Sequence, residues 1–199
     1  MTMAKKSTAE LLSVIVGPSA AKGLASRPLA ELFGFTSPRQ GNLVGEDIAP
    51  YGVHPAMEAA RELLARAFEE QMEEGVSLSS PQAVRGFLTA RIAGLGHEVF
   101  WVLYLDSQNR LLAAEEMFRG TLTQTSVYPR EIVKRALEFN CHATILAHNH
   151  PSGLVEPSQA DRWLTDQLKA ALGMVDVRVL DHFVIGGAKY TSFAERGWL

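Results

Sequence analysis

The first part of the chain, residues 1–76, has the pattern of short helices joined by loops that contain Gly and Pro. The clearest helix is predicted over residues 55–74, where apolar residues recur at helical spacing and glutamates occupy the other side. The predicted apolar face consists of Met57, Ala60, Leu63, Leu64 and Phe68, opposite Glu58, Glu69 and Glu70. Gly75 follows as the expected C-cap, and residues 77–80 are typical of a linker that leads into the N-cap of another helix.

Strands and helices alternate in the second part, from residue 80 onward. A helix is predicted over residues 80–92, and residues 99–105 form an apolar run rich in β-formers, typical of a strand buried on both faces. A turn at 106–109 leads to a hairpin partner at 111–117. The remaining predicted elements are a helix at 129–139, a strand at 143–147, a helix at 158–172 ended by Gly173, and closing strands at 177–180, 183–185 and 190–193 with Gly186 and Gly187 as a hairpin turn. The order β-β-α-β-α-β-β predicts an α/β fold with a mixed sheet and helices packed on it.

Composition narrows the class of protein. The 199 residues are enough for one full domain and a smaller attachment, and 47% apolar with 21% charged residues is ordinary for a soluble globular protein. A net charge of -3 without a Lys/Arg cluster gives no reason to expect attraction to nucleic acid or to an anionic membrane. Cys141 is the single cysteine, so an intramolecular disulfide is excluded and a reducing cytoplasm is the expected location.

The amino-terminal apolar run at residues 11–16 is not expected to be a signal peptide, because it is short and Glu10 interrupts it. No segment approaches the roughly 20 apolar residues that a membrane-spanning helix needs. Membrane association is therefore not predicted.

The most informative segment for chemistry is residues 147–161. His148 and His150 stand two apart at the end of a predicted strand, so both imidazoles project from the same face. Pro151 disfavours helical geometry at His150 and helps to keep it extended. The helix that follows places Asp161 in its first turn. Two imidazoles and one carboxylate suit zinc with a fourth position left for water, which is the pattern of a catalytic zinc site.

A structural interpretation exists for each half of this segment. Ser158 and Asp161 match the Ser-x-x-acid pattern of a helix N-terminus, and a His-x-His pair alone is often buried or on the surface for other reasons. Taken alone, each half favours a structural role, whereas the two halves together favour a metal site. The two interpretations are compatible, because a cap can fix the direction of a metal-binding carboxylate.

The spacing His148-x-His150-x7-Ser158-x2-Asp161 resembles the full signature of the JAMM/MPN metallohydrolases. The string His-Asn-His-Pro-Ser-Gly from His148, followed by Pro-Ser-x-x-Asp, resembles the RadC branch of that family. Supporting strings carry the resemblance over nearly all of residues 77–199; they are Leu105-Asp-Ser-Gln-Asn-Arg110, Phe118-Arg-Gly-Thr-Leu122, Pro129-Arg-Glu131, Leu180-Asp-His182 and Ser192-Phe-Ala-Glu-Arg-Gly197. The resemblance implies a cytidine-deaminase-like α/β/α sandwich with a mixed sheet. It also implies that this domain follows a small helical region, residues 1–76, which resembles a degenerate helix-hairpin-helix module.

The same resemblance implies the roles of individual residues. One zinc ion per chain is expected on His148, His150 and Asp161. Glu98, just ahead of the first strand, is the implied general base, which accepts a proton from water and passes it to a leaving amine. Ser158 is implied to stabilise the oxyanion. Without the resemblance, Glu98 would be interpreted as a solvated residue at a strand start.

Several other polar residues are weaker candidates. Glu115 and Glu116 are rival bases, but they stand in the middle of a predicted strand without a motif. His182 lies in a string shared with the family, so both a site-lining role and a structural role stay open. Cys141 lacks the Pro-Cys-x-x-Cys context of a deaminase zinc site and is expected to be a buried thiol, and His142 is expected to be structural. The letters His-Asn-His do not indicate an HNH nuclease, whose motif residues are dispersed along the chain.

Members of the RadC branch often carry a DNA-repair label. In this chain His54 stands where a second glycine of the phosphate-binding hairpin is expected, and a side chain there obstructs the approach of a phosphate. DNA binding is therefore only weakly supported, and residues 1–76 are expected to pack on the catalytic domain or to bind a protein partner.

Two functions remain in view. The favoured one is a zinc-dependent hydrolase, of metalloprotease or isopeptidase type, that cleaves an amide bond in a peptide or protein substrate. The alternative is a DNA-processing accessory or interaction module whose metal site is structural or vestigial. The sequence specifies neither the substrate nor the oligomeric state, although the edge of the hairpin at Gly186 and Gly187 is one place where a second chain could pair.

Overall fold

The computed structural model describes residues 6–35, 53–74, 81–120 and 127–199. The four helices of its amino-terminal part are α1 (Thr8–Val16), α2 (Pro18–Leu24), α3 (Leu29–Leu32) and α4 (Pro55–Glu73). The remaining elements are α5 (Pro81–Ile92), β1 (Val99–Leu105), β2 (Leu111–Arg119), α6 (Pro129–Glu138), β3 (Ala143–Asn149), α7 (Gln159–Gly173), β4 (Arg178–Gly186) and β5 (Lys189–Ser192). None of the helices in these ranges has the length and apolar character needed to cross a membrane.

The five described strands form one mixed sheet in the order β2-β1-β3-β4-β5. β1 pairs antiparallel with both β2 and β3, β3 pairs parallel with β4, and β4 pairs antiparallel with β5. The parallel pair needs a crossover connection, which α7 supplies. The prediction of an α/β fold with a mixed sheet is therefore confirmed.

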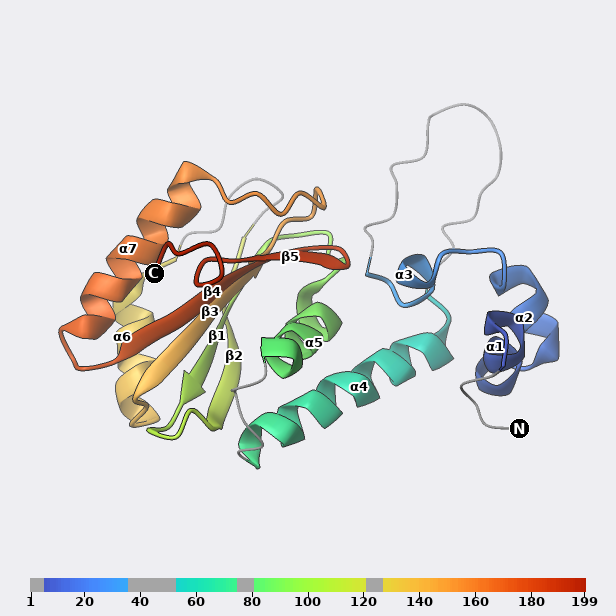
Figure 1. Cartoon of the computed structure of the whole chain (residues 1–199), viewed down its shortest axis with the longest axis horizontal. Coiled ribbons are helices and arrows are strands. Elements are labelled where there is room, and N and C mark those ends of the chain that lie inside the picture. Colours follow the sequence, from blue (N-terminus) through green and yellow to red (C-terminus); the bar gives the residue numbers. More distant parts are fainter. Residues whose placement is uncertain (1–5, 36–52, 75–80, 121–126) are drawn as a thin grey trace.

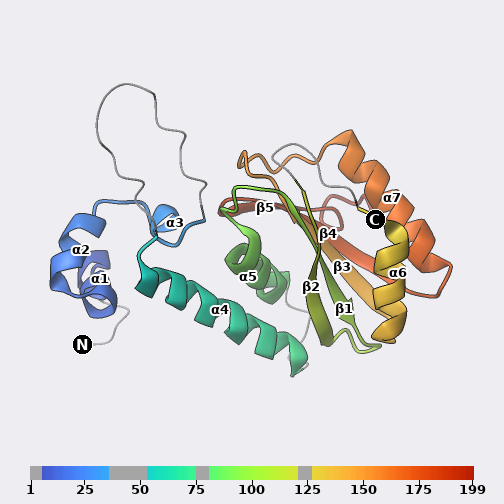
Figure 2. The same ribbon diagram turned by 180° about the vertical axis from the view of Figure 1, so that it is seen from behind.

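Helices lie on both faces of the sheet (Figures 1 and 2): α6 and α7 on one face, and α5, with α4 beyond it, on the other. Successive residues of β1 alternate between the two resulting cores. Leu103 packs with Phe87 of α5, whereas Val102 packs with Ile132 of α6 and Leu168 of α7. The continuous apolar run of this strand reflects burial on both faces, as its composition predicted.

The buried face of α4 differs from the prediction. Leu63 and Leu64 are 66% and 47% exposed, while Met57, Ala65 and Met72 are buried. The prediction is confirmed for Met57 and for Phe68, which packs against the core, and it was wrong for Leu63 and Leu64 because it followed apolar side chains alone. The stripe that contacts the rest of the molecule includes Arg61, whose guanidinium donates hydrogen bonds to main-chain carbonyls of neighbouring segments.

Some predicted boundaries also differ. The helix α7 continues through Gly173 to a C-cap at Met174, and the chain then turns at Asp176, whose φ is 59°. The two closing strands predicted at 177–180 and 183–185 form the single strand β4. Since Gly186 pairs with Lys189, the hairpin turn is formed by residues 187 and 188 rather than by Gly186 and Gly187. The predicted C-cap at Gly75 and the linker at 77–80 lie outside the described residues.

Candidate metal centre

The two histidines of the His-x-His pair come together at the end of the central strand β3. His148 is the partner of Phe100 on β1 and of Val184 on β4. His150 follows the strand, and its N–H still donates to the carbonyl of Ile185 at 2.8 Å, so the extended path continues past the assigned end. The Nε2 atoms of His148 and His150 are 3.1 Å apart.

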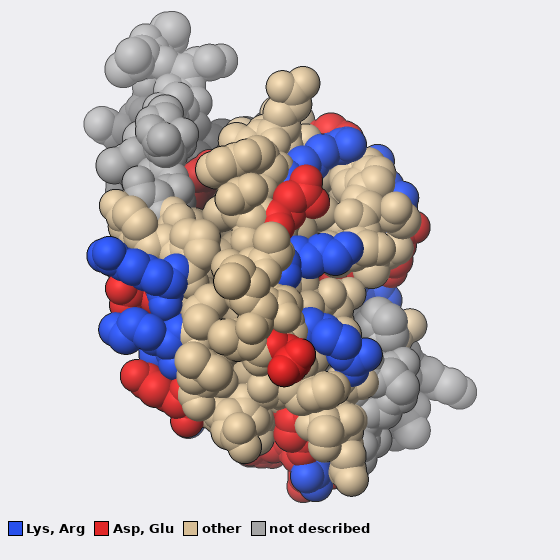
Figure 3. All heavy atoms as spheres, turned by 90° about the vertical axis from the view of Figure 1, so that its left-hand side faces the viewer, with Lys and Arg blue, Asp and Glu red and all other residues tan. Residues whose placement is uncertain are grey.

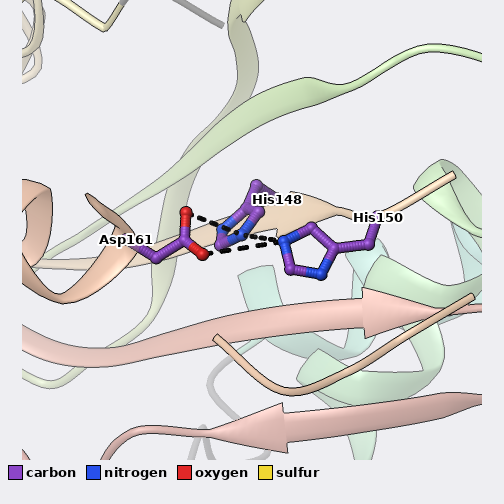
Figure 4. A group of neighbouring side chains, drawn as sticks. All are labelled: His148, His150 and Asp161. Atoms are coloured by element: carbon purple, nitrogen blue, oxygen red, sulfur yellow. Dashed lines mark hydrogen bonds and ion pairs between the residues drawn. The ribbon is translucent and has the colours of Figure 1, made fainter. Parts of the chain in front are cut away.

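Asp161 reaches the same point from the first turn of α7. Ser158 is the N-cap of this helix, and a capping box joins its side chain to that of Asp161. The Asp161 carboxylate lies with Oδ1 3.4 Å from His148 Nε2 and with Oδ2 3.7 Å from His150 Nε2. Figure 4 shows the carboxylate facing both imidazoles. The three residues therefore form a cluster that could hold a metal ion.

The chemistry of this donor set fits zinc. Ligands on a tetrahedral zinc ion lie about 3.3 Å from one another, given zinc–nitrogen bonds of about 2.05 Å. The measured separations of the candidate ligand atoms are close to that value. The Nδ1 atom of His150 lies 2.8 Å from the carbonyl oxygen of Leu154. Because a carbonyl only accepts hydrogen bonds, Nδ1 carries the proton and Nε2 is left as a lone pair that points toward the cluster.

Electrostatics keep the carboxylate of the cluster charged. Burial acts to raise the pKa of Asp161, but the interactions with His148, His150 and Ser158 outweigh it and hold the pKa far below the ordinary value. The Asp161 carboxylate raises the pKa of His150, against the effect of burial. A metal ligand of this type must be deprotonated, and Asp161 meets that condition.

A cavity of about 420 Å³ opens beside the cluster. Its polar wall consists of the three candidate ligands together with Glu98 and Ser158, and its apolar wall consists of Phe100, Val127, Ala160, Trp163 and Leu164. Trp163 is 65% exposed. All five residues selected from the sequence as candidate site residues thus line one cavity.

Glu98 and its two rivals occupy different places. Glu98 precedes β1 and lines the cavity, and its main-chain carbonyl accepts a hydrogen bond from Gly120 at 2.9 Å. Glu115 and Glu116 do not line the cavity; Glu115 pairs with Arg135 and Glu116 pairs with Arg119. Of the three glutamates, only Glu98 shares a cavity with the candidate ligands.

Ser158 is engaged with Asp161 in this structure. Its hydroxyl donates to Oδ2 of the carboxylate at 2.7 Å and accepts from the Asp161 main-chain N–H at 3.1 Å. The main-chain N–H of Ser158 also donates to Oδ2 at 2.7 Å. These three contacts orient the carboxylate toward the histidines. The Asp161 side chain is therefore both part of the helix cap and a candidate metal ligand.

His182 lies directly behind His148 and is completely buried. Its Nε2 is 2.8 Å from Nδ1 of His148, and its Nδ1 is 2.7 Å from Oγ1 of Thr165. His182 therefore contacts a candidate ligand from behind but does not line the cavity. Sequence reasoning missed Thr165 entirely. The available signal was its spacing, because Thr165 follows Asp161 by one helical turn on α7.

The remaining candidates lie apart from the cluster. Cys141 is buried, and burial raises the pKa of its thiol. His142 directly precedes β3, and its main-chain N–H donates to the carbonyl of Leu105 at the end of β1. The structure therefore gives neither residue a place in the cavity.

Comparison with known proteins identifies the family. A profile described as the RadC-like JAB domain matches residues 78–198. A UPF0758 protein of Leptothrix cholodnii is 52% identical over 180 residues, which cover 88% of this chain and 81% of the relative. A UPF0758 protein of Nitrosomonas eutropha is 48% identical over 200 residues, with 96% of this chain and 88% of the relative covered. Another, from a Janthinobacterium species, is 57% identical over 152 residues, with 74% and 68% covered. The chain therefore belongs to the RadC-like JAB domain family.

Proposed function

We propose that this chain is a zinc-dependent hydrolase that cleaves an amide or isopeptide bond and holds one zinc ion on His148, His150 and Asp161. The observation that carries the proposal is the convergence of two imidazole Nε2 atoms and a carboxylate in an open cavity that Glu98 also lines. An open three-ligand site is typical of catalytic rather than structural zinc.

Glu98 and Ser158 have distinct roles in this proposal. A zinc ion on the three ligands would supply a Lewis acid that polarises a carbonyl and lowers the pKa of water. The Glu98 carboxylate then accepts the proton of the attacking water and delivers it to the leaving amine. The Ser158 hydroxyl turns away from Asp161 and donates to the carbonyl oxygen of the substrate as negative charge develops there.

The apolar wall of the cavity favours a substrate with an apolar side chain beside the cleaved bond. Phe100, Val127, Trp163 and Leu164 line this wall. An apolar side chain seated against them displaces water from the reacting groups and strengthens the interactions of Glu98 and Ser158 with the substrate.

The division of the chain follows the same reasoning. We infer a hydrolase domain at residues 77–199 and a helical region at residues 1–76 that packs on it. Helices on both faces of the sheet support a relation to the cytidine-deaminase-like α/β/α sandwich. On the face that carries α6 and α7, Lys and Arg alternate with Asp and Glu (Figure 3), so this face offers no broad positive surface for a phosphate backbone.

The first test measures the zinc content of purified protein. Wild type re-equilibrated with zinc is expected to retain about one zinc per chain. His150→Ala is expected to lose it, because two ligands hold the ion too weakly to survive buffer exchange. A well-folded wild type without zinc would contradict the proposal.

The second test separates hydrolysis from metal binding. Glu98→Gln keeps the shape of the cavity and is expected to retain zinc, while cleavage of peptide or isopeptide substrates falls by about a hundredfold or more. Glu115→Gln, at a glutamate outside the cavity, serves as the matched control and is expected to leave cleavage unchanged. Zinc binding with no cleavage, combined with DNA binding that Glu98→Gln does not affect, would favour the accessory-module function instead.

A further inference from the structure

Four groups form a continuous line of hydrogen bonds behind the candidate metal centre. The line runs from the main-chain carbonyl of Asp161 to Oγ1 of Thr165 at 2.6 Å, and from there to Nδ1 of His182 at 2.7 Å. It ends between Nε2 of His182 and Nδ1 of His148 at 2.8 Å. The last atom belongs to the same imidazole whose Nε2 faces Asp161 across the cluster.

The direction of these hydrogen bonds follows from the number of protons available. The Asp161 carbonyl can only accept, so the single hydroxyl proton of Thr165 points to it. The Thr165 oxygen must then accept from Nδ1–H of His182. A neutral imidazole carries one N–H, so Nε2 of His182 is an acceptor and Nδ1 of His148 is the donor.

We propose that His182 and Thr165 are positioning residues that hold His148 in the Nδ1–H tautomer, so that its Nε2 presents a lone pair to the cluster. Leu154 does the same for His150 through its carbonyl oxygen. The two lone pairs then face each other across 3.1 Å, an arrangement that a bound cation stabilises. The consequence for zinc affinity rests on the proposed function, whereas the tautomer itself does not.

The surroundings of His182 support this role. Phe100 and Phe193 lie against the ring, with centroid distances of 5.6 Å and 4.8 Å, so water is kept from replacing either hydrogen-bond partner. His182 is completely buried between these apolar rings, an environment that disfavours a charged imidazolium and favours a neutral ring whose Nε2 accepts. Parallel pairing of β3 with β4 places Leu146 beside His182 and His148 beside Val184, which puts both histidines on the same face of neighbouring strands.

The test reads the tautomer directly. Long-range proton–nitrogen spectra of metal-free, ¹⁵N-labelled protein, recorded at a pH where the imidazoles are neutral, distinguish an Nδ1–H from an Nε2–H histidine. His148 is expected as Nδ1–H in wild type and as a mixture or as Nε2–H in His182→Phe. A proton on Nε2 of His148 in wild type overturns the proposal.

Zinc affinity supplies the second measurement. His182→Phe and Thr165→Val are each expected to weaken zinc binding by about ten- to one-hundredfold, the usual effect of losing a partner behind a ligand. His182→Gln is expected to restore most of the affinity, because its amide oxygen can accept from His148 while its amide N–H donates to Thr165. A general loss of packing would not be rescued in this way.

Thr144→Val is the matched control for Thr165→Val, since Thr144 is a completely buried threonine on β3 outside the line of hydrogen bonds. It is expected to leave both the tautomer and the zinc affinity unchanged. Wild-type affinity in a folded His182→Phe overturns the positioning role. A wild type that binds no zinc but holds His148 as Nδ1–H contradicts the proposed function and supports the positioning role.

Discussion

At the residue scale, Ser158 and Asp161 combine two tasks that are usually separate. Their side chains cap α7, and the cap turns the Asp161 carboxylate toward His148 and His150. The chain contains a second capping box of the same type, in which Ser7 and Glu10 begin α1. Only the first of these boxes lines the cavity.

Comparing the two capping boxes tests whether the cap of α7 contributes to zinc binding. Ser158→Ala and Ser7→Ala each remove a cap worth about 1 kcal/mol to its own helix. Zinc affinity is expected to fall about tenfold in Ser158→Ala, because Asp161 loses both contacts with the Ser158 hydroxyl and keeps only the one from the main-chain N–H. Competition with a zinc-binding dye gives the affinity. Equal affinities in the two variants would show that the cap does not orient the ligand.

At the element scale, Arg61 connects α4 to two other segments. Its guanidinium donates to the carbonyls of Ala90 at 2.6 Å and Ala93 at 3.0 Å, near the C-terminus of α5, and to that of Gly34 after α3 at 3.1 Å. The last carbonyls of a helix have no partner within the helix, so the half-buried guanidinium of Arg61 satisfies them well. This contact joins the helical region to the part of the chain that carries the sheet.

Replacing Arg61 is expected to weaken this junction. Arg61→Ala leaves several carbonyls without a partner and should lower the free energy of unfolding by about 2 to 3 kcal/mol. Arg66→Ala is the control on the same helix; its ion pair with Glu62 is exposed to solvent, so its removal is expected to leave the free energy of unfolding almost unchanged. Urea denaturation measures both values. Similar small losses in the two variants would mean that Arg61 does not hold the two parts together.

At the scale of the whole molecule, the candidate ligands come from two elements joined only by a loop. His148 lies near the end of the central strand β3, and Asp161 lies in the first turn of α7, the helix that crosses from β3 to β4. An ion bound to both therefore ties the helix to the sheet in the folded chain and finds no such site in the unfolded chain.

Zinc is accordingly expected to stabilise the folded protein. At a free zinc concentration one hundred times the Kd, binding adds about 2.7 kcal/mol to the free energy of unfolding. For a chain of this size the midpoint of thermal unfolding should rise by about 5 to 10 °C. Scanning calorimetry with zinc and with a chelator measures the shift. The same shift in His150→Ala would place the stabilising ion elsewhere.

The features that the sequence predicts correctly depend on local pattern. The alternation of side chains along a strand puts His148 and His150 on one face, and the Ser-x-x-Asp spacing places Asp161 at a helix start, whatever the rest of the chain does. The continuous apolar run of β1 likewise predicts that the strand is buried on both faces. The roles of Glu98 and Ser158 came only from the family resemblance and stay predictions.

The features that the sequence does not predict depend on contacts between segments that are distant in the chain. His182 stands 34 residues from His148 and Thr165 stands 17 from His182, so no local period links the three, and only strand pairing and the packing of α7 bring them together. The exposure of Leu63 has the same origin, because periodicity identifies apolar positions but not which side of a helix meets a neighbour. A charged residue such as Arg61 can occupy the buried side when main-chain carbonyls of other segments satisfy it, and only the tertiary structure supplies those carbonyls.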